Sequence, residues 1–143
     1  MRVVLIPAVL LAACATTAET ESSAATAAAT YDATATADRL APQRLRDGEC
    51  GLFGWNLEQR FVFFAAEDRA RYLGQGGPVD LTPRGEFPAT DYGPVSLRLG
   101  PPEALIEGQR YARARVTETL PDGFTRVVPL VIVETCKAVV PAL

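Results

Sequence analysis

The pattern of hydrophobic positions divides the 143 residues of this chain into three regions. An apolar run occupies residues 3–11, and a tract of alanine, threonine and serine then extends to residue 38. From residue 39 onward, short apolar and aromatic segments alternate with turn-forming glycine and proline, as in β-strands separated by loops. Only this last part has enough large apolar side chains to offset the entropy of ordering its backbone.

Strand-length segments fill the last part of the chain, residues 39–143. They lie at residues 49–55, 60–66, 69–73, 79–81 and 95–99. Glu67-Asp68 is expected to form a turn, and the residues between 74 and 94 are otherwise expected to be mainly loops because they are rich in glycine and proline. A short helix is expected around Pro102 to Glu107.

A long C-terminal hairpin is the strongest prediction, because residues 109–120 and 124–136 flank Pro121-Asp122-Gly123. A three-residue loop that ends in glycine is a common hairpin connection. Setting Leu120 opposite Phe124 makes one face apolar in the middle with opposite charges at both ends, whereas a slip of one residue would reverse every side chain. The expected pairs are Glu118–Arg126, Val116–Val128, Ala114–Leu130, Ala112–Ile132 and Arg110–Glu134.

The other face of this hairpin is a candidate surface for a ligand or partner. It is expected to carry Tyr111, Arg113, Arg115 and Thr117 opposite Val133, Val131, Pro129 and Val127. Guanidinium groups recognise phosphates, carboxylates and anionic sugars. The alternative is a solvated face whose arginine stems cover apolar neighbours. Pro129 indicates an edge strand or a bulge, because proline has no N–H for the ladder.

An aromatic cluster is expected where the first two strands meet. Its members are Phe53, Trp55, Phe61, Phe63 and Phe64. Such a cluster is typical of a core, with a ligand pocket as the alternative. The segments together predict an all-β fold, a small antiparallel barrel or sandwich of about six to eight strands.

The N-terminal apolar run ends in Leu11-Ala12-Ala13-Cys14, with Arg2 in front of it. The run is shorter than the roughly 20 apolar residues of a membrane-spanning helix, and small residues precede Cys14 as in signal-peptide cleavage sites. This box resembles that of bacterial lipoproteins. The resemblance implies cleavage between Ala13 and Cys14, acylation of Cys14, and anchoring in the outer membrane, because Ala15 and not Asp follows. An ordinary secretory signal is the alternative, and it also implies export.

Residues 1–13 are therefore expected to be a lipoprotein signal peptide, and residues 14–38 a lipidated cysteine with a disordered tether. The domain of residues 39–143 would then face the periplasm of a Gram-negative bacterium. With Cys14 acylated, Cys50 and Cys136 remain as a pair in an oxidising compartment, which predicts a disulfide. A metal site or redox pair is the alternative, but there is no histidine and no Cys-x-x-Cys motif.

Charge and composition narrow the function. Acidic and basic residues balance at 13 each within residues 39–143, and the formal net charge of −3 comes from the acidic tether, so no nucleic-acid partner is expected. No catalytic residue, cofactor or metal site is identified, because histidine is absent and Ser96, the only serine in this part, has no recognisable base. The oligomeric state is left open.

The leading hypothesis is a non-enzymatic binding or scaffolding module that meets an envelope protein or a peptidoglycan-associated partner. In layout the chain also resembles small lysozyme-inhibitor lipoproteins, which combine this kind of box with a disulfide-linked β-barrel. That resemblance implies inhibition of a lytic enzyme, although their inhibitory loop motif has no counterpart in this sequence. An envelope enzyme that uses carboxylates is the third alternative.

Overall fold

The computed structural model describes residues 38–141. The Leu11–Cys14 box, the cleavage site and all of the expected tether except residue 38 lie outside the described residues. None of the residues from 38 to 141 belongs to a helix with the length and hydrophobicity needed to cross a bilayer.

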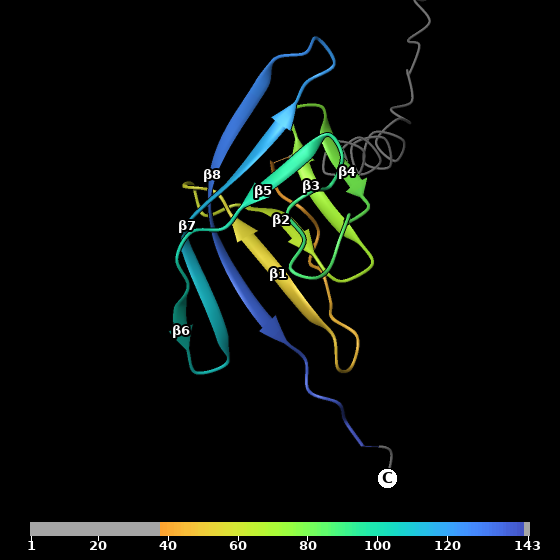
Figure 1. Ribbon diagram of the computed structural model, residues 1–143, viewed down its shortest axis with the longest axis vertical. Coiled ribbons are helices and arrows are strands. Elements are labelled where there is room, and N and C mark those ends of the chain that lie inside the picture. The colour runs from red at the N-terminus through yellow and green to blue at the C-terminus, as the bar shows by residue number, and fades with distance from the viewer. Residues whose placement is uncertain (1–37, 142–143) are drawn as a thin grey trace, which may run out of the picture. The chain divides into compact units, whose positions relative to one another are not determined.

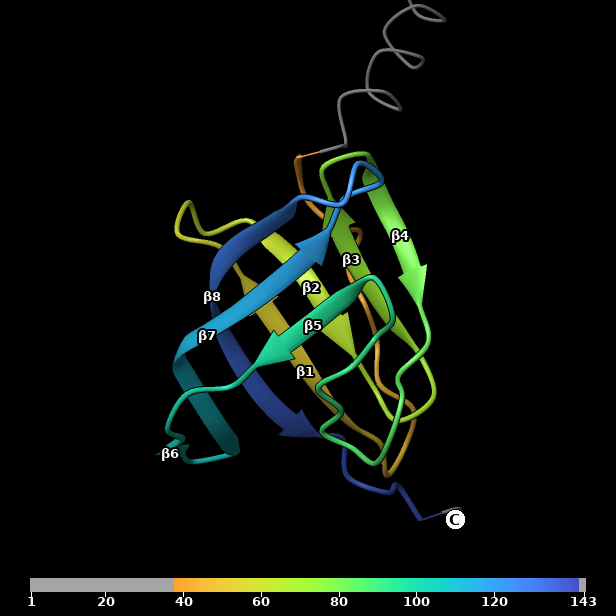
Figure 2. The same ribbon diagram turned by 45° about the horizontal axis from the view of Figure 1, so that its top comes forward.

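The described residues form one antiparallel sheet that curls into a half-barrel (Figures 1 and 2). Its strand order is β4-β3-β2-β1-β8-β7-β5, and β6 pairs with β7 beside this path. This confirms the prediction of a small antiparallel all-β fold. The strands are β1 (Cys50–Trp55), β2 (Phe61–Ala65), β3 (Ala70–Gly74), β4 (Gly77–Leu81), β5 (Val95–Arg98), β6 (Glu103–Leu105), β7 (Gly108–Thr119) and β8 (Thr125–Cys136).

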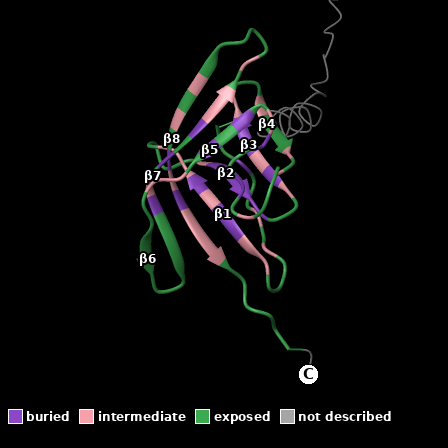
Figure 3. Ribbon diagram, viewed as in Figure 1, coloured by how far each residue is buried: buried purple, intermediate pink, exposed green. Residues whose placement is uncertain are grey.

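The core lies on the concave face of the curled sheet and receives buried side chains from β1, β2, β3, β5, β7 and β8, whereas β6 is exposed throughout (Figure 3). Its central side chains have at most 1% of their surface exposed; they are Leu52, Phe63, Tyr72, Val116, Leu130 and Ile132. These side chains come from β1, β2, β3, β7 and β8. A slip of one residue in any of these strands would turn its buried side chain outward, so burial in this core determines their register.

The segment that precedes β1 covers part of the opposite, convex face. Leu40 is only 3% exposed, and its backbone N–H donates to the Phe61 carbonyl oxygen at 2.7 Å. Leu45 packs so closely on Gly51 that an added Cβ would lie 2.5 Å from its side chain. Phe64 also points away from the core and is 1% exposed; the Arg69 guanidinium lies 5.4 Å from its ring centroid and the Phe53 ring lies 5.2 Å away.

The β7–β8 hairpin has the predicted turn and half of the predicted register. Gly123 has a φ of +88°, and the Gly123 N–H donates to the Leu120 carbonyl. Glu118 pairs with Arg126, Val116 with Val128 and Ala114 with Leu130, as expected; the first of these pairs is also a salt bridge of 3.2 Å.

The last two predicted pairs of this hairpin are wrong, because a β-bulge interrupts β7 between Tyr111 and Ala114. Tyr111, not Ala112, pairs with Ile132, and Gln109, not Arg110, pairs with Glu134. One extra residue in a strand turns the residues beyond it to the opposite face. Tyr111 therefore points into the core and is 7% exposed, which removes it from the predicted outer surface.

The expected helix around Pro102 to Glu107 is also wrong. Residues 103–105 form β6, and a tight turn at Ile106 and Glu107 leads directly into β7. Gly108 ends this turn with a φ of +125°, a conformation that other residues rarely adopt. The hairpin favours strand over helix because β6 gains ladder hydrogen bonds from the long neighbouring β7.

The Cys50–Cys136 disulfide joins the start of β1 to the end of β8, where these two residues face each other in the ladder. The pairing predicted from the cysteine count is the one in the structure. The sheet is not closed into a full barrel, because β4 and β5 at the two ends of the strand order do not pair with each other. The bridge between Asp91 and Ser96 covers the outer edge of β5.

Candidate functional site

Two polar clusters lie on the concave face, one at each end of the β7–β8 hairpin. In the first, the Tyr72 hydroxyl donates to Glu118 Oε2 at 3.3 Å and accepts from Arg126 Nη2 at 3.2 Å. In the second, the Tyr111 hydroxyl donates to Glu134 Oε2 at 2.7 Å. Each cluster satisfies the polar end of a buried tyrosine, so both stabilise the core.

The pKa values of both tyrosines follow from this burial. Desolvation raises the pKa of Tyr72, and it raises that of Tyr111 to about 12, with the Glu134 carboxylate adding to the effect. Neither shift makes the hydroxyl a better base near neutral pH, because a raised pKa keeps it protonated.

Arginines lower the pKa of two carboxylates, the largely buried Glu49 beside the disulfide and the exposed Asp68. A hydrogen bond from Arg69 is the main cause for Glu49, and one from Arg46 is the main cause for Asp68. A general acid needs the opposite shift, a pKa raised toward neutral pH. These pairs therefore act as structural contacts between the segment before β1 and the β2–β3 turn.

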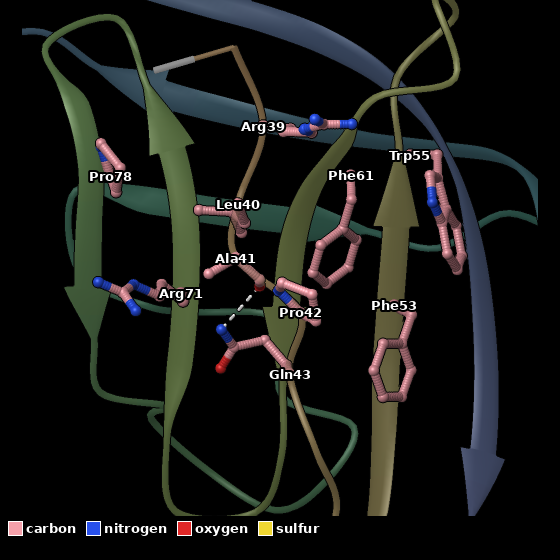
Figure 4. A pocket seen from close by; sticks show the side chains of 10 residues that line it. All are labelled: Arg39, Leu40, Ala41, Pro42, Gln43, Phe53, Trp55, Phe61, Arg71 and Pro78. Atoms are coloured by element: carbon pink, nitrogen blue, oxygen red, sulfur yellow. Dashed lines mark hydrogen bonds between the residues drawn. The ribbon is translucent and has the colours of Figure 1, made fainter. Parts of the chain in front are cut away.

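An open hollow of about 760 Å³ lies on the convex face, and we call it the aromatic hollow. Figure 4 shows Phe53, Trp55 and Phe61 on one side of the segment 39–43, and Arg71 and Pro78 on the other. The ring centroids of Trp55 and Phe61 are 5.6 Å apart, and those of Phe53 and Phe61 are 6.1 Å apart. All three rings are half-buried, so each leaves part of its surface to solvent.

The predicted aromatic cluster thus divides between the two faces of the sheet. Phe63 belongs to the core, where its ring meets that of Tyr92 edge-on at 5.5 Å. The other three rings lie on the convex face. Phe53 and Trp55 alternate with the buried residues of β1, and Phe61 of β2 joins them because the β1–β2 ladder is irregular beside Trp55. The core expectation is confirmed for Phe63, and the other three rings line a hollow, for which a ligand stays a prediction.

A second hollow, of about 680 Å³, lies on the convex face where β5, β7 and β8 meet, and it contains two of the predicted surface residues. Arg113 and Arg115 line it together with Arg98, and all three are exposed. We call these three residues the arginine surface. Tyr111 is not part of it, because the bulge in β7 turns this side chain into the core.

Arg98 was not anticipated as a member of this surface. It faces Arg115 directly across the β5–β7 ladder, and Arg115 in turn faces Pro129 of β8. Nine residues, 99–107, separate the end of β5 from the start of β7 and include β6, so the sequence contains no local signal for this pairing. Alternation along β5 indicates only that Arg98 points away from the core.

No protein-family model, curated protein or solved structure matches this chain. Within the part of the chain that the structure describes, no three histidine, cysteine, aspartate or glutamate side chains are grouped as metal ligands. The candidate site is therefore defined by geometry alone: a filled concave face, and a convex face with an aromatic hollow and an arginine surface.

Proposed function

We propose that this chain is an outer-membrane lipoprotein whose β-domain is a non-enzymatic binding module in the periplasm. The aromatic hollow carries the proposal. Its three half-exposed rings lie on a rigid sheet, and aromatic side chains of this kind are the usual anchors of protein interfaces. The partner is an envelope protein that inserts an apolar side chain beside Trp55.

Two further observations favour binding over catalysis. The pKa values of Glu49 and Asp68 are lowered, which keeps both carboxylates ionised. The concave face is filled by side chains such as Phe63 and Leu130, which are at most 1% exposed, so a substrate has no room there. Binding through the convex face needs neither a cavity in the core nor a titrating group.

The membrane anchor rests on the Leu11-Ala12-Ala13-Cys14 box. Two acyl chains are enough for stable attachment, since each buried methylene contributes about 0.8 kcal/mol. In this proposal residues 15–38 serve as the tether, because a random coil of 24 residues would span about 27 Å root-mean-square and would lift the domain clear of the headgroups.

Site-specific photocrosslinking in intact cells tests the proposal. We expect a photoreactive amino acid at Trp55 to give an adduct with an envelope protein, and the same amino acid at exposed Glu86 to give none. In the same cells, radioactive palmitate should label the chain with Cys14 and not the Cys14→Ala variant. Finding the chain alone at position 55 would contradict the binding module, and an unlabelled wild-type chain would contradict the anchor.

A further inference from the structure

The arginine surface lacks the partners that usually accompany a cluster of exposed arginines. Arg98 and Arg115 are cross-strand neighbours, an arrangement that is unfavourable for two like charges. Among residues 38–141, no carboxylate lies within salt-bridge distance of Arg98, Arg113 or Arg115. The fold thus keeps three positive charges together with no internal anion to balance them.

Arg113 lines the same hollow as Arg98 and Arg115, at a point where two backbone segments approach closely. The bulge in β7 gives two residues, Ala112 and Arg113, the place of one in the ladder. The chain that leaves β5 passes directly against this bulge, since a Cβ added at Gly100 would lie 3.0 Å from the Cβ of Arg113. Gly100 therefore permits a close approach that a larger residue would obstruct.

The rest of the hollow is apolar. Every side chain that lines it is either arginine or nonpolar, and no side chain in it has a hydrogen-bond acceptor. Val127 is 56% exposed and Leu57 is 71% exposed. If the arginine stems served only to cover apolar neighbours, Val127 would be largely covered, so that interpretation does not account for this surface.

We infer that the arginine surface binds an anionic amphiphile, a phosphate-headed lipid whose acyl chain lies along Val127 and Leu57. The guanidinium groups match the oxygen geometry of a phosphate, and the nonpolar lining matches a hydrocarbon chain. A carbohydrate or peptide would present several donors, for which the lining side chains have no acceptor. This site shares no lining residue with the aromatic hollow, so the inference stands independently of the proposed function.

The test is an NMR titration of the full chain carrying Cys14→Ala, so that no acyl group is attached there. The probe is a short-chain phosphatidic acid, used below its micellar concentration. We expect shifts of the backbone amides at residues 98–100, 112–115 and 127–130, with affinity about tenfold or more above that for the phosphocholine lipid of the same chains. Inorganic phosphate, the headgroup without its chain, should bind weakly at the same residues.

Charge-matched variants identify the site. R113Q/R115Q should weaken binding of the phosphatidic acid about tenfold or more, whereas R44Q/R60Q, which removes two exposed arginines elsewhere, should not. Equal weakening by both variants would show a general charge effect and overturn the site. Equal affinity for the two lipids would overturn the anionic headgroup, and equal affinity for inorganic phosphate would overturn the acyl chain.

Discussion

Glu49 connects the segment before β1 to the β2–β3 turn through one carboxylate. It accepts hydrogen bonds from Arg69 in the β2–β3 turn, one of them 2.9 Å long, and from the backbone N–H of Arg46 at 2.7 Å. Its side chain is only 9% exposed. Arg69 also donates to the Arg44 carbonyl at 3.0 Å, so the pair holds the segment before β1 against the sheet.

This contact predicts a loss of stability in acid. The hydrogen bond from Arg69 lowers the pKa of Glu49 in the folded chain from its ordinary value of 4.5. The stabilisation is complete above pH 4.5 and is lost as the pH falls through the lowered value, because the unfolded chain then binds a proton first. Urea denaturation between pH 3 and about 6 should show the free energy of unfolding decreasing toward acid.

Glu49→Gln should flatten this acid dependence without abolishing it, since Arg46 also lowers the pKa of Asp68. The matched control is Glu58→Gln, an exposed residue of the β1–β2 turn that forms no ion pair within residues 38–141. An acid dependence as steep in Glu49→Gln as in the wild type would show that Arg69 does not hold this carboxylate ionised.

At the scale of single elements, the β6–β7 hairpin depends on one backbone position. Gly108 has a φ of +125°, and a Cβ there would lie 2.0 Å from the carbonyl oxygen of Glu134 on β8. That close approach lets the start of β7 pair with β8 directly after the tight turn from β6.

Gly108→Ala should therefore reduce the free energy of unfolding by about 1–3 kcal/mol, as expected for backbone strain at one residue. Gly76→Ala is the control, because Gly76 lies in the β3–β4 turn with nothing within 4 Å of an added Cβ. Its change should stay below about 0.5 kcal/mol. Thermal and urea denaturation measure both, and equal stability of the two variants would contradict the proposed strain.

For the whole molecule, the Cys50–Cys136 disulfide closes a loop that contains nearly the entire domain, with a sequence separation of 86 residues. In the chain-entropy account, such a loop stabilises the folded state by up to about 4.6 kcal/mol, because the cross-link restricts the unfolded chain. Cys136 is exposed at the end of β8, so reductant has access to the bond.

The double variant Cys50→Ala/Cys136→Ala should lose about 2–4 kcal/mol of unfolding free energy relative to the oxidised protein. Reductant should destabilise the wild type to a similar degree and leave the double variant unchanged. The intact mass of the wild type should rise by two hydrogens on reduction. If reductant shifts the mass but not the denaturation midpoint, the disulfide does not contribute to stability.

Much of this fold was predictable because its signals are local. Alternation along residues 95–98 and the Pro121-Asp122-Gly123 loop determine which side chains face inward near each turn, and β5 and the distal hairpin follow them. The cysteine pairing was also predictable, since two partners remain once Cys14 is assigned to the anchor. A bulge, by contrast, has no comparable signal in Ala112-Arg113, because both residues are compatible with regular strand.

The sequence by itself determined the all-β class, the main strands, the hairpin turn and the disulfide, because hydrophobic period and turn chemistry act over a few residues. Only the tertiary structure decided that Tyr111 belongs to the core, that Trp55 and Phe61 line a hollow, and that Arg98 lies opposite Arg115. Those placements depend on a one-residue register shift and on pairing between strands far apart in the chain. The energy that selects them comes from burying the whole curled sheet at once.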